Sequence, residues 1–414
     1  MLDIAIVGTG VVSALGCSPK EYHARMMAGE CAIRAAPWDA GPGKHAWWAM
    51  IDDFNAADWM DPKLIDGTDV FAQYAFATAK QALAEADLGA LDAERTAIVH
   101  GVSMGGVRAL TLAQHKLETE GPAAIPRKTE IQIYPNMAAS QIAMAHQLHG
   151  PSLTVTTACA ASLDALGQAA QMIHYGQVDV AIAGATDGGL TIAGDPGFTP
   201  AVFYTSTLYG MVAPATDPRR AMLPFDANRR GIVVGEGSAM FILENGARAR
   251  ARGARILGYI RGYGTLADAY HPSSPDPTGR WEARAMEKAL ASAGIEAGQV
   301  DALIAHATGT PKGDTAEINA INMVHGDRAK PLPAASIKGH IGHSGAASGA
   351  MALVTGLLGM AEDRFIFNCN TTDPDPEARF DVVIEKPREM RVDTLQLNSF
   401  GFGGQNASMI VTKT

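Results

Sequence analysis

A cysteine and two histidines are the side chains whose types and settings could do covalent chemistry. Cys159 stands where the β-branched run at 153–157 gives way to small residues with a helical apolar pattern, which predicts a cysteine between a buried strand and a helix. The unpaired N–H groups and positive end of such a helix favour a thiolate, and small neighbours leave room for a bulky substrate. A buried structural cysteine fits this segment equally well, so the rest of the chain must decide.

His306 and His343 occupy matching places later in the chain. His306 follows the apolar run 300–305, and His343 follows the run 333–338. Ligand sites in α/β proteins collect at the ends of strands. A single histidine among the 12 of this chain would more often be a core or surface group. Two histidines in equivalent loops instead favour a site shared with Cys159.

Two other chemistries use the same residue types. His340 and His343 have the HxxH spacing of zinc ligands, but Ile341 and Gly342 oppose a rigid helix presenting both rings, and no Asp or Glu stands close by. A papain-like protease also needs a cysteine, a histidine and an orienting amide. The surroundings of Cys159 carry no aromatic residue and no Cys-Gly-x-Cys pattern. We therefore expect no metal site and disfavour proteolysis.

The composition is that of a compact enzyme. Hydrophobic residues make up 47% and charged residues 18% of the chain, and the formal charge is −10, from 33 basic and 43 acidic residues. Without a basic run interleaved with aromatics, nucleic acid is not an expected partner. The four scattered cysteines do not make a disulfide framework, which favours a reducing cytoplasm. With no cationic leader and no uninterrupted apolar stretch of membrane length, we expect a cytoplasmic protein without membrane contact.

The opening segment raises one cofactor hypothesis. An apolar strand at 2–7 runs into Gly8 and Gly10, and two glycines after a strand are typical of dinucleotide-binding turns. Ser13 stands where the third glycine of GxGxxG belongs. We therefore expect no dinucleotide and no other cofactor.

The second half of the chain repeats the order of the first. It runs through a strand and glycine turn at 256–264 like the opening one, a helix at 283–293, a strand at 300–305, and a segment at 333–360 that echoes the cysteine segment. This pattern predicts two halves, 1–248 and 249–414. Their equivalent turns would meet on a pseudo-twofold axis and form one shared site.

Four separated segments resemble the signatures of β-ketoacyl-acyl carrier protein synthases. They are TACAAS at 157–162, HATGTPKGD at 306–314, KGHIGH at 338–343 and NSFGFGG at 398–404. Their order and spacing match, and the similarity runs over essentially the whole chain. The chain most resembles the elongating type II synthases of fatty acid and polyketide assembly.

The resemblance implies a fold, a reaction and a partner. The fold is the duplicated thiolase fold, an α/β architecture of five layers, α-β-α-β-α. The reaction is a decarboxylative Claisen condensation, in which malonyl-acyl carrier protein lengthens a Cys-bound acyl chain and yields β-ketoacyl-acyl carrier protein for fatty acid, polyketide or polyene biosynthesis. The partners are an acyl carrier protein and a second subunit, either an identical copy or a chain-length-factor-like homologue. Chain length and pathway stay open.

Carried over onto matching positions, the resemblance gives the reacting groups their roles. Cys159 is the nucleophile, and His306 and His343 hydrogen-bond the malonyl thioester carbonyl as carbon dioxide leaves. Neutral imidazoles do this without net proton exchange. The backbone N–H groups of Cys159 and Phe400 form an oxyanion hole, and Phe400 is an aromatic gate over the cysteine.

The remaining roles concern support, substrate and carrier. Lys338 and Glu317 match a supporting ion pair, which an ordinary buried salt bridge that orders the loops would also explain. The substrate-binding positions are Met104, Phe198, Ser273 and Phe402, although Met104 would serve equally well as core filler. Residues 268–275 match a second loop that swings with the Phe400 loop. Arg127 and Lys128 match the basic pair that meets the acidic carrier protein.

Three departures from the family pattern stand out. Gln405 replaces a usual threonine, and the stretch 199–218 is longer than in fatty acid synthases, where the acyl pocket and dimer interface should lie. The acidic segment 61–66 replaces a more cationic helix. This leads to the hypothesis that a partner subunit supplies part of the carrier-docking surface.

Two other functions are open within the same fold. A starter-loading acyltransferase would use Cys159 without malonyl decarboxylation, which the retention of both histidines disfavours. A non-catalytic scaffold subunit would typically lack the nucleophile, which is present here.

Overall fold

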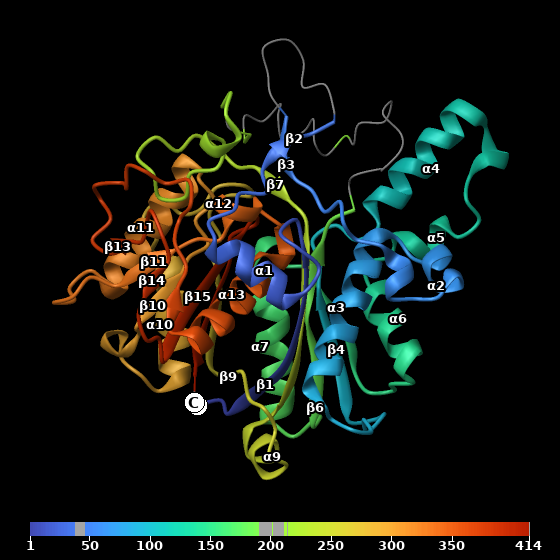
Figure 1. Ribbon diagram of the computed structural model, residues 1–414, viewed down its shortest axis with the longest axis horizontal. Helices are drawn as coiled ribbons and strands as arrows, with labels where there is room; N and C mark the ends of the chain where they lie inside the picture. Colours follow the sequence, from blue (N-terminus) through green and yellow to red (C-terminus); the bar gives the residue numbers. More distant parts are fainter. Residues whose placement is uncertain (38–45, 190–200, 202–210, 213, 414) are drawn as a thin grey trace.

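The protein is built around one mixed sheet of 11 strands, seen in the computed structural model, which describes residues 1–37, 46–189, 201, 211–212 and 214–413. The strand order is β13-β11-β10-β15-β16-β9-β1-β8-β6-β4-β5. Figure 1 shows strands of this sheet running through the middle of the molecule. The first block of strands is β1 (Ile4–Ser13), β4 (Thr96–Gly101), β5 (Ser152–Val155), β6 (Val180–Asp187) and β8 (Gly237–Asn245). The second block is β9 (Gly258–Ala267), β10 (Ala302–Ile304), β11 (Pro333–Ala335), β13 (Asp381–Val382), β15 (Thr394–Gly401) and β16 (Gln405–Thr412).

The two blocks have the same internal topology. The order β5-β4-β6-β8-β1 corresponds to β11-β10-β15-β16-β9, and in both blocks the first two pairings are parallel and the last two antiparallel. The blocks meet where β1 pairs with β9. The duplication expected from the sequence is therefore present in the strand order.

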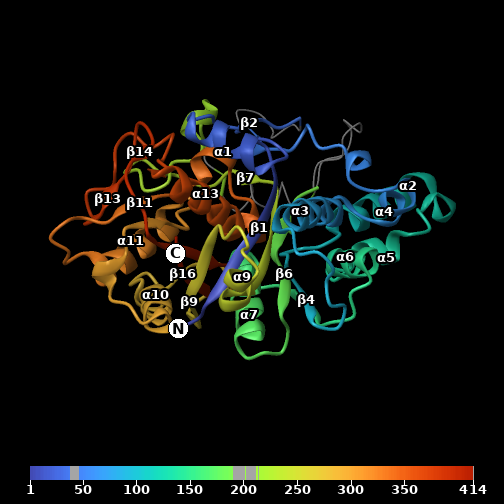
Figure 2. The ribbon, with the colours of Figure 1, turned by 60° about the horizontal axis from the view of Figure 1, so that its bottom comes forward.

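Helices complete the layers. The central helices α7 (Ala161–His174) and α13 (Ser348–Glu362) lie between the two blocks of strands. The helices α3 (Val70–Ala86) and α6 (Met137–His146) cover the first block, and α10 (Arg280–Ala293) and α11 (Pro311–His325) lie on the other side of the molecule (Figure 2). This is the five-layered arrangement of the thiolase fold.

Shorter elements lie around these layers. The helices are α1 (Pro19–Met27), α2 (Pro62–Gly67), α4 (Val107–Glu120), α5 (Thr129–Ile133), α9 (Gly246–Ala251) and α12 (Lys338–Ile341). The strands are β2 (Arg34–Ala35), β3 (Trp47–Ala49) and β7 (Val234–Gly235) in one small sheet, and β12 (Arg364–Phe365) and β14 (Arg388–Glu389) in another.

Glycines inside β1 and β9 let a helix lie directly on the strand backbone. A Cβ at Gly8 would lie 2.1 Å from the Ala82 carbonyl oxygen on α3, and one at Gly264 would lie 2.4 Å from that of Ala285 on α10. We expected glycine turns at both places, but both segments continue as strands. The missing side chains permit close helix packing instead of a turn.

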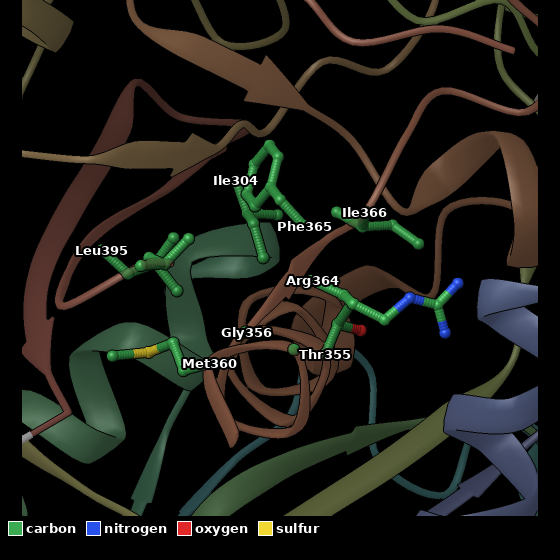
Figure 3. Close-up of a pocket in the computed structure, with 10 residues that line it drawn as sticks. Ile304, Thr355, Gly356, Met360, Arg364, Phe365, Ile366 and Leu395 are labelled. Atoms are coloured by element: carbon green, nitrogen blue, oxygen red, sulfur yellow. The ribbon is translucent and has the colours of Figure 1, made fainter. Parts of the chain in front are cut away.

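The central helix α13 belongs to the core. An 18-residue segment that contains it, Gly345–Glu362, has a mean hydropathy of 1.2 and is 78% buried. We expected no apolar stretch of membrane length. This segment reaches that length, but its burial identifies it as a core helix. A small apolar pocket between α13 and its neighbours is lined by Ile304, Met360, Leu395 and others (Figure 3), and it contains no thiol or imidazole.

Strand β5 forms one edge of the sheet. It pairs with β4, and among the described residues it has no strand on its other side. Leu153 on this strand is 42% exposed. The sequence predicted a buried strand here, so that expectation is wrong for a single chain.

Candidate active site

Cys159 lies at a strand-to-helix turn, as predicted. A short 3-10 turn, Ala158–Ala160, connects β5 to α7. Ala158 has a φ of 49°, in the left-handed region that costs a residue other than glycine about 1–2 kcal/mol. The Ser399 hydroxyl on β15 donates to the Cys159 carbonyl at 2.6 Å. A strand of the second half therefore helps to hold the turn of the first.

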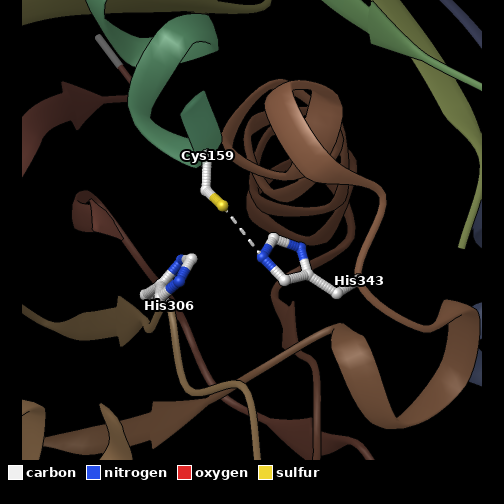
Figure 4. Close-up of side chains that lie close together, drawn as sticks. All are labelled: Cys159, His306 and His343. Carbon is white, nitrogen blue, oxygen red and sulfur yellow. Dashed lines mark hydrogen bonds between the residues drawn. The ribbon is translucent and has the colours of Figure 1, made fainter. Parts of the chain in front are cut away.

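Two histidines from the second half face this cysteine (Figure 4). His343 follows α12, and its Nε2 lies 3.1 Å from Cys159 Sγ. His306 follows β10, and its ring centre lies 5.3 Å from that of His343, with the planes at 81°. The sulfur and one nitrogen from each ring all lie within 4.8 Å of one another. A carbonyl group bound beside the sulfur would be within reach of both rings.

All three groups are uncharged at neutral pH. Desolvation raises the pKa of the Cys159 thiol to about 11, and it holds the pKa values of His306 and His343 well below the ordinary value. We expected the helix end to favour a thiolate, but desolvation outweighs that effect. The nearby Lys338 charge lowers the thiol pKa only in part. The sulfur therefore needs a base in contact with it, and His343 is in that position.

Lys338 and Glu317 both order the His306 loop. Lys338 Nζ donates to the His306 carbonyl and lies 3.4 Å from the His306 Nδ1. Glu317 on α11 accepts from the backbone N–H groups of His306 at 2.9 Å and Ala307 at 2.6 Å, and from the Asn398 amide at 3.2 Å. These bonds run from each charge to the loop and not from one charge to the other. Lys338 and Glu317 are therefore not bonded to each other as the expected ion pair would be; each charge instead bonds to the His306 loop.

The segment after β15 closes over the cysteine turn. Phe400 is buried, with its ring centre 6.0 Å from that of His306. A Cβ at Gly401 would lie 3.0 Å from the backbone nitrogen of Cys159. The backbone N–H of Phe402 bonds to the Cys159 sulfur and lowers the pKa of the thiol. The oxyanion hole that the resemblance assigns to the N–H groups of Cys159 and Phe400 stays a prediction. The Phe402 side chain itself is 50% exposed.

The second predicted loop is bonded to this segment. The Asp268 N–H donates to the Gly404 carbonyl at 2.8 Å, and the Gly403 N–H donates to the Pro272 carbonyl at 2.7 Å. Ser273 is exposed, and its N–H donates to His271 Nδ1 at 3.1 Å. Movement of either loop would therefore stretch bonds to the other.

A buried carboxylate joins the Met104 loop to the His343 turn. Asp187 accepts from the Ser103 N–H at 3.1 Å and from the Ala346 N–H at 2.5 Å. Met104 is 39% exposed. Phe198 and most of the stretch 199–218 lie outside the described residues.

The carrier-docking pair has unequal surroundings. Arg127 is exposed, whereas Lys128 Nζ lies 2.7 Å from Asp66 Oδ2. Asp66 belongs to the acidic segment 61–66, and it partly neutralises the charge of Lys128.

His340 has a structural setting. It is fully buried, and its ring nitrogens lie 3.0 Å from the Glu30 carbonyl oxygen and 2.9 Å from that of Phe367. The neutral ring donates to one of these two carbonyls. Because both nitrogens are engaged by backbone groups, His340 and His343 do not form the metal pair that their spacing could suggest.

The sequence interpretation missed four polar side chains around the site. Asn398 and Ser399 lie in one of the four family motifs without an assigned role, and Asp187 and Ser348 were not singled out. The available signal was weak: Asp187 is the last residue of β6 and Ser348 the first of α13, whereas Asn398 and Ser399 lie inside β15. Ser348 Oγ lies 2.9 Å from the Nδ1 of His343.

Comparison with known proteins identifies the family. The family models of the β-ketoacyl synthase N-terminal and C-terminal domains match residues 1–249 and 257–372. The chain is 35% identical to 3-oxoacyl-[acyl-carrier-protein] synthase 2 of Rhizobium meliloti (strain 1021), over 100% of this chain and 99% of the relative. The solved structure of the ishigamide ketosynthase/chain length factor matches with a TM-score of 0.90 and 30% identity, over 100% of this chain and 99% of that one. A β-ketoacyl synthase from Burkholderia phymatum STM815 matches with a TM-score of 0.89 and 31% identity, over 100% of both chains. The chain therefore belongs to the β-ketoacyl synthase family.

Proposed function

We propose that this protein catalyses the decarboxylative condensation of malonyl-acyl carrier protein with an acyl chain on Cys159. The product is a β-ketoacyl-acyl carrier protein for fatty acid, polyketide or polyene biosynthesis. The observation that carries the proposal is the convergence of the Cys159 sulfur with the two neutral imidazoles of His306 and His343. The name of the Rhizobium meliloti relative supports this substrate class.

The first half-reaction loads the acyl chain. The Cys159 sulfur attacks the carrier thioester while His343 Nε2, at 3.1 Å, takes the thiol proton. The carbon–sulfur bond to the carrier breaks, and the departing thiolate receives that proton. Loading therefore leaves the net charge of the desolvated site unchanged.

The second half-reaction begins with decarboxylation. The acylated sulfur has no proton, so both imidazoles are free to donate to the malonyl thioester carbonyl. Carbon dioxide leaves, and the electron pair of the broken bond forms an enolate whose oxygen the two N–H groups hold. Lys338 beside the His306 Nδ1 favours the neutral ring with its proton on Nε2. A starter-loading enzyme would have no use for this pair of donors.

Condensation follows at the same sulfur. The enolate carbon attacks the Cys159 thioester, and the backbone N–H groups of Cys159 and Phe400 hold the developing oxyanion. The carbon–sulfur bond then breaks, and the Cys159 thiolate takes up one proton from water, which balances the negative charge that the malonyl carboxylate brought in.

A two-step assay tests the function. Incubation with an acyl-carrier thioester should add one acyl group, located on Cys159 by mass spectrometry of the digested protein. Malonyl-carrier protein should then release one carbon dioxide per β-ketoacyl product. An unmodified Cys159 would contradict the proposal, and an adduct without carbon dioxide release would favour starter loading.

As the pH is raised, the rate of malonyl decarboxylation should begin to fall well below pH 10.5. Burial lowers the pKa of Lys338 from 10.5, and the Glu317 charge opposes this only in part. As the pH rises through the lowered value, Nζ loses its charge, so the developing enolate loses a nearby cation. The check is a pH profile of carbon dioxide release at saturating malonyl-carrier protein. Lys338→Met should be slower at neutral pH and lack this alkaline limb; a wild-type rate that stays level up to pH 10 argues against the role.

Carrier docking should depend more on Arg127 than on Lys128. Arg127→Glu is expected to raise the KM for the carrier protein about tenfold at unchanged kcat. Lys128→Glu should do less, because Asp66 already compensates that charge. Arg284→Glu, which changes an exposed arginine on α10, serves as the control. Equal effects at all three positions would show that Arg127 and Lys128 do not form the carrier-docking surface.

The working enzyme is a dimer that forms along β5. An open strand edge is a template for pairing with another chain. Exposed apolar side chains gather on β5 and the adjacent helices, among them Ile131, Tyr134, Met144 and Leu153. The similar ishigamide protein is a ketosynthase/chain length factor, so the second subunit here is either another copy or a homologue of the chain-length-factor kind.

Leu153→Asp should convert the dimer into monomers. The substitution places a charge in the proposed interface, where a desolvated carboxylate has no partner. Light scattering after gel filtration measures the result. Met323→Asp on α11 is the matched control, since Met323 is also exposed, at 54%, and should leave the dimer intact. A Leu153→Asp protein that stays dimeric rules out β5 as the contact.

Two further assignments complete the proposal. The protein is soluble and cytoplasmic, in keeping with its free cysteines Cys17, Cys31, Cys159 and Cys369. We place the boundary between its halves at residues 248 and 249, within α9, the helix that links β8 to β9.

A further inference from the structure

The two site histidines have different partners at Nδ1. His306 Nδ1 faces Lys338 Nζ at 3.4 Å. A charged ammonium group only donates, so it keeps the proton of a neutral His306 on Nε2. His343 Nδ1 faces the Ser348 hydroxyl at 2.9 Å. A hydroxyl both donates and accepts, so it does not commit His343 to one tautomer.

The surroundings of Ser348 allow its hydroxyl to turn. Ser348 is the first residue of α13 and is 2% exposed. Its oxygen lies 3.3 Å from the Ser344 hydroxyl, and Ser344 can itself donate to the Met351 sulfur at 3.3 Å. Ser348 can therefore accept from His343 while it donates to Ser344, or donate to His343 while it accepts from Ser344. Neither arrangement leaves a buried hydrogen-bonding group without a partner.

The proposed reaction requires both tautomers of His343. During loading, Nε2 must be free of a proton to take the one on Cys159, so the ring proton belongs on Nδ1. During decarboxylation, Nε2 must carry a proton to donate to the malonyl carbonyl. A fixed donor or a fixed acceptor at Nδ1 would favour one half-reaction and oppose the other.

We propose that Ser348 is a positioning residue whose hydroxyl lets His343 alternate between base and hydrogen-bond donor, an inference that rests on the proposed function. With the proton on Nδ1, Ser348 accepts; with the proton on Nε2, Ser348 donates to Nδ1. Between the half-reactions Nε2 takes a proton from water and Nδ1 gives one back to water, so the ring passes through a brief charged form and is neutral before and after the exchange. His306, held by Lys338, remains a donor in both halves.

Substitutions at Ser348 test this role in the full-length protein. Ser348→Ala should slow both Cys159 acylation and malonyl decarboxylation by about 10- to 100-fold, and Ser348→Thr, which keeps the hydroxyl, should restore most of both rates. Thr355→Val is the matched control, because it removes another buried hydroxyl of α13 that bonds to Tyr22 and not to His343. That variant should retain both rates.

The tautomers can also be observed in the unaltered protein. With ¹⁵N-labelled histidine, His343 should carry its proton on Nδ1 in the free enzyme and on Nε2 after acylation of Cys159. The same tautomer in both states, a Ser348→Ala variant at wild-type rates, or loss of only one half-reaction would each overturn the proposal. A wild-type protein that neither acylates Cys159 nor releases carbon dioxide instead refutes the proposed function itself.

Discussion

Cys159→Ala abolishes acylation and lowers condensation by more than about 10⁴-fold, because the covalent intermediate has no other site. Malonyl decarboxylation should continue, since His306 and His343 keep their N–H donors and lose only a neighbouring sulfur. The experiment follows acyl adducts by mass spectrometry and carbon dioxide release from labelled malonyl-carrier protein in parallel. The two readouts separate the nucleophile from the donors.

Cys17→Ala is the matched control for this experiment. Burial raises the pKa of Cys17 to about 11, as for Cys159, so the two thiols are equally protonated and differ in their neighbours. Only Cys159 has an imidazole nitrogen at 3.1 Å. Cys17→Ala should therefore acylate normally. Acylation that survives in Cys159→Ala would show that the assigned nucleophile is wrong.

His343→Ala should damage both half-reactions. Removal of one preorganised donor to a developing oxyanion typically costs about 10²- to 10³-fold in rate, and we expect carbon dioxide release to fall by this amount. Acylation should also slow, because the protonated Cys159 thiol loses its base. His306→Ala should reduce decarboxylation similarly but spare acylation more, since the hydrogen bond to the sulfur comes from His343. Single-turnover assays of each step measure the difference.

His340→Ala distinguishes a site histidine from a structural one. His340 lies three positions before His343, but its ring nitrogens lie against the backbone carbonyls of Glu30 and Phe367 and the ring donates to one of them. Leaving that buried carbonyl unpaired costs about 1–3 kcal/mol, so we expect a lower melting temperature. Decarboxylation per folded molecule should stay close to wild type. Equal catalytic loss in His340→Ala and His343→Ala would refute the separation of their roles.

Much of the site could be predicted because its parts are local in the chain. Cys159 was recognisable from the change between a β-branched run and a small-residue helix, and His306 and His343 from their positions after apolar strands. The repeated order of strands and helices then indicated that these turns converge. Each step used only neighbouring residues and the periodicity of secondary structure.

Other features depended on neighbours far away in the chain. Gly8 and Gly264 looked like turn residues until α3 and α10 were placed against them. The Lys338 and Glu317 charges matched an ion pair, but each bonds to the His306 loop. Lys128 counted as a docking charge, although Asp66, 62 positions earlier in the chain, lies against it.

The sequence by itself determined which groups are available: one thiol before a helix, two imidazoles after strands, and a doubled framework to bring them together. Only the tertiary structure decided their protonation and the direction of their hydrogen bonds. A pKa depends on how much water the fold removes around a group, and a tautomer depends on the atom that faces the far nitrogen of the ring. The pKa of the Cys159 thiol, raised to about 11, and the contrast between Lys338 behind His306 and Ser348 behind His343 arise from these contacts.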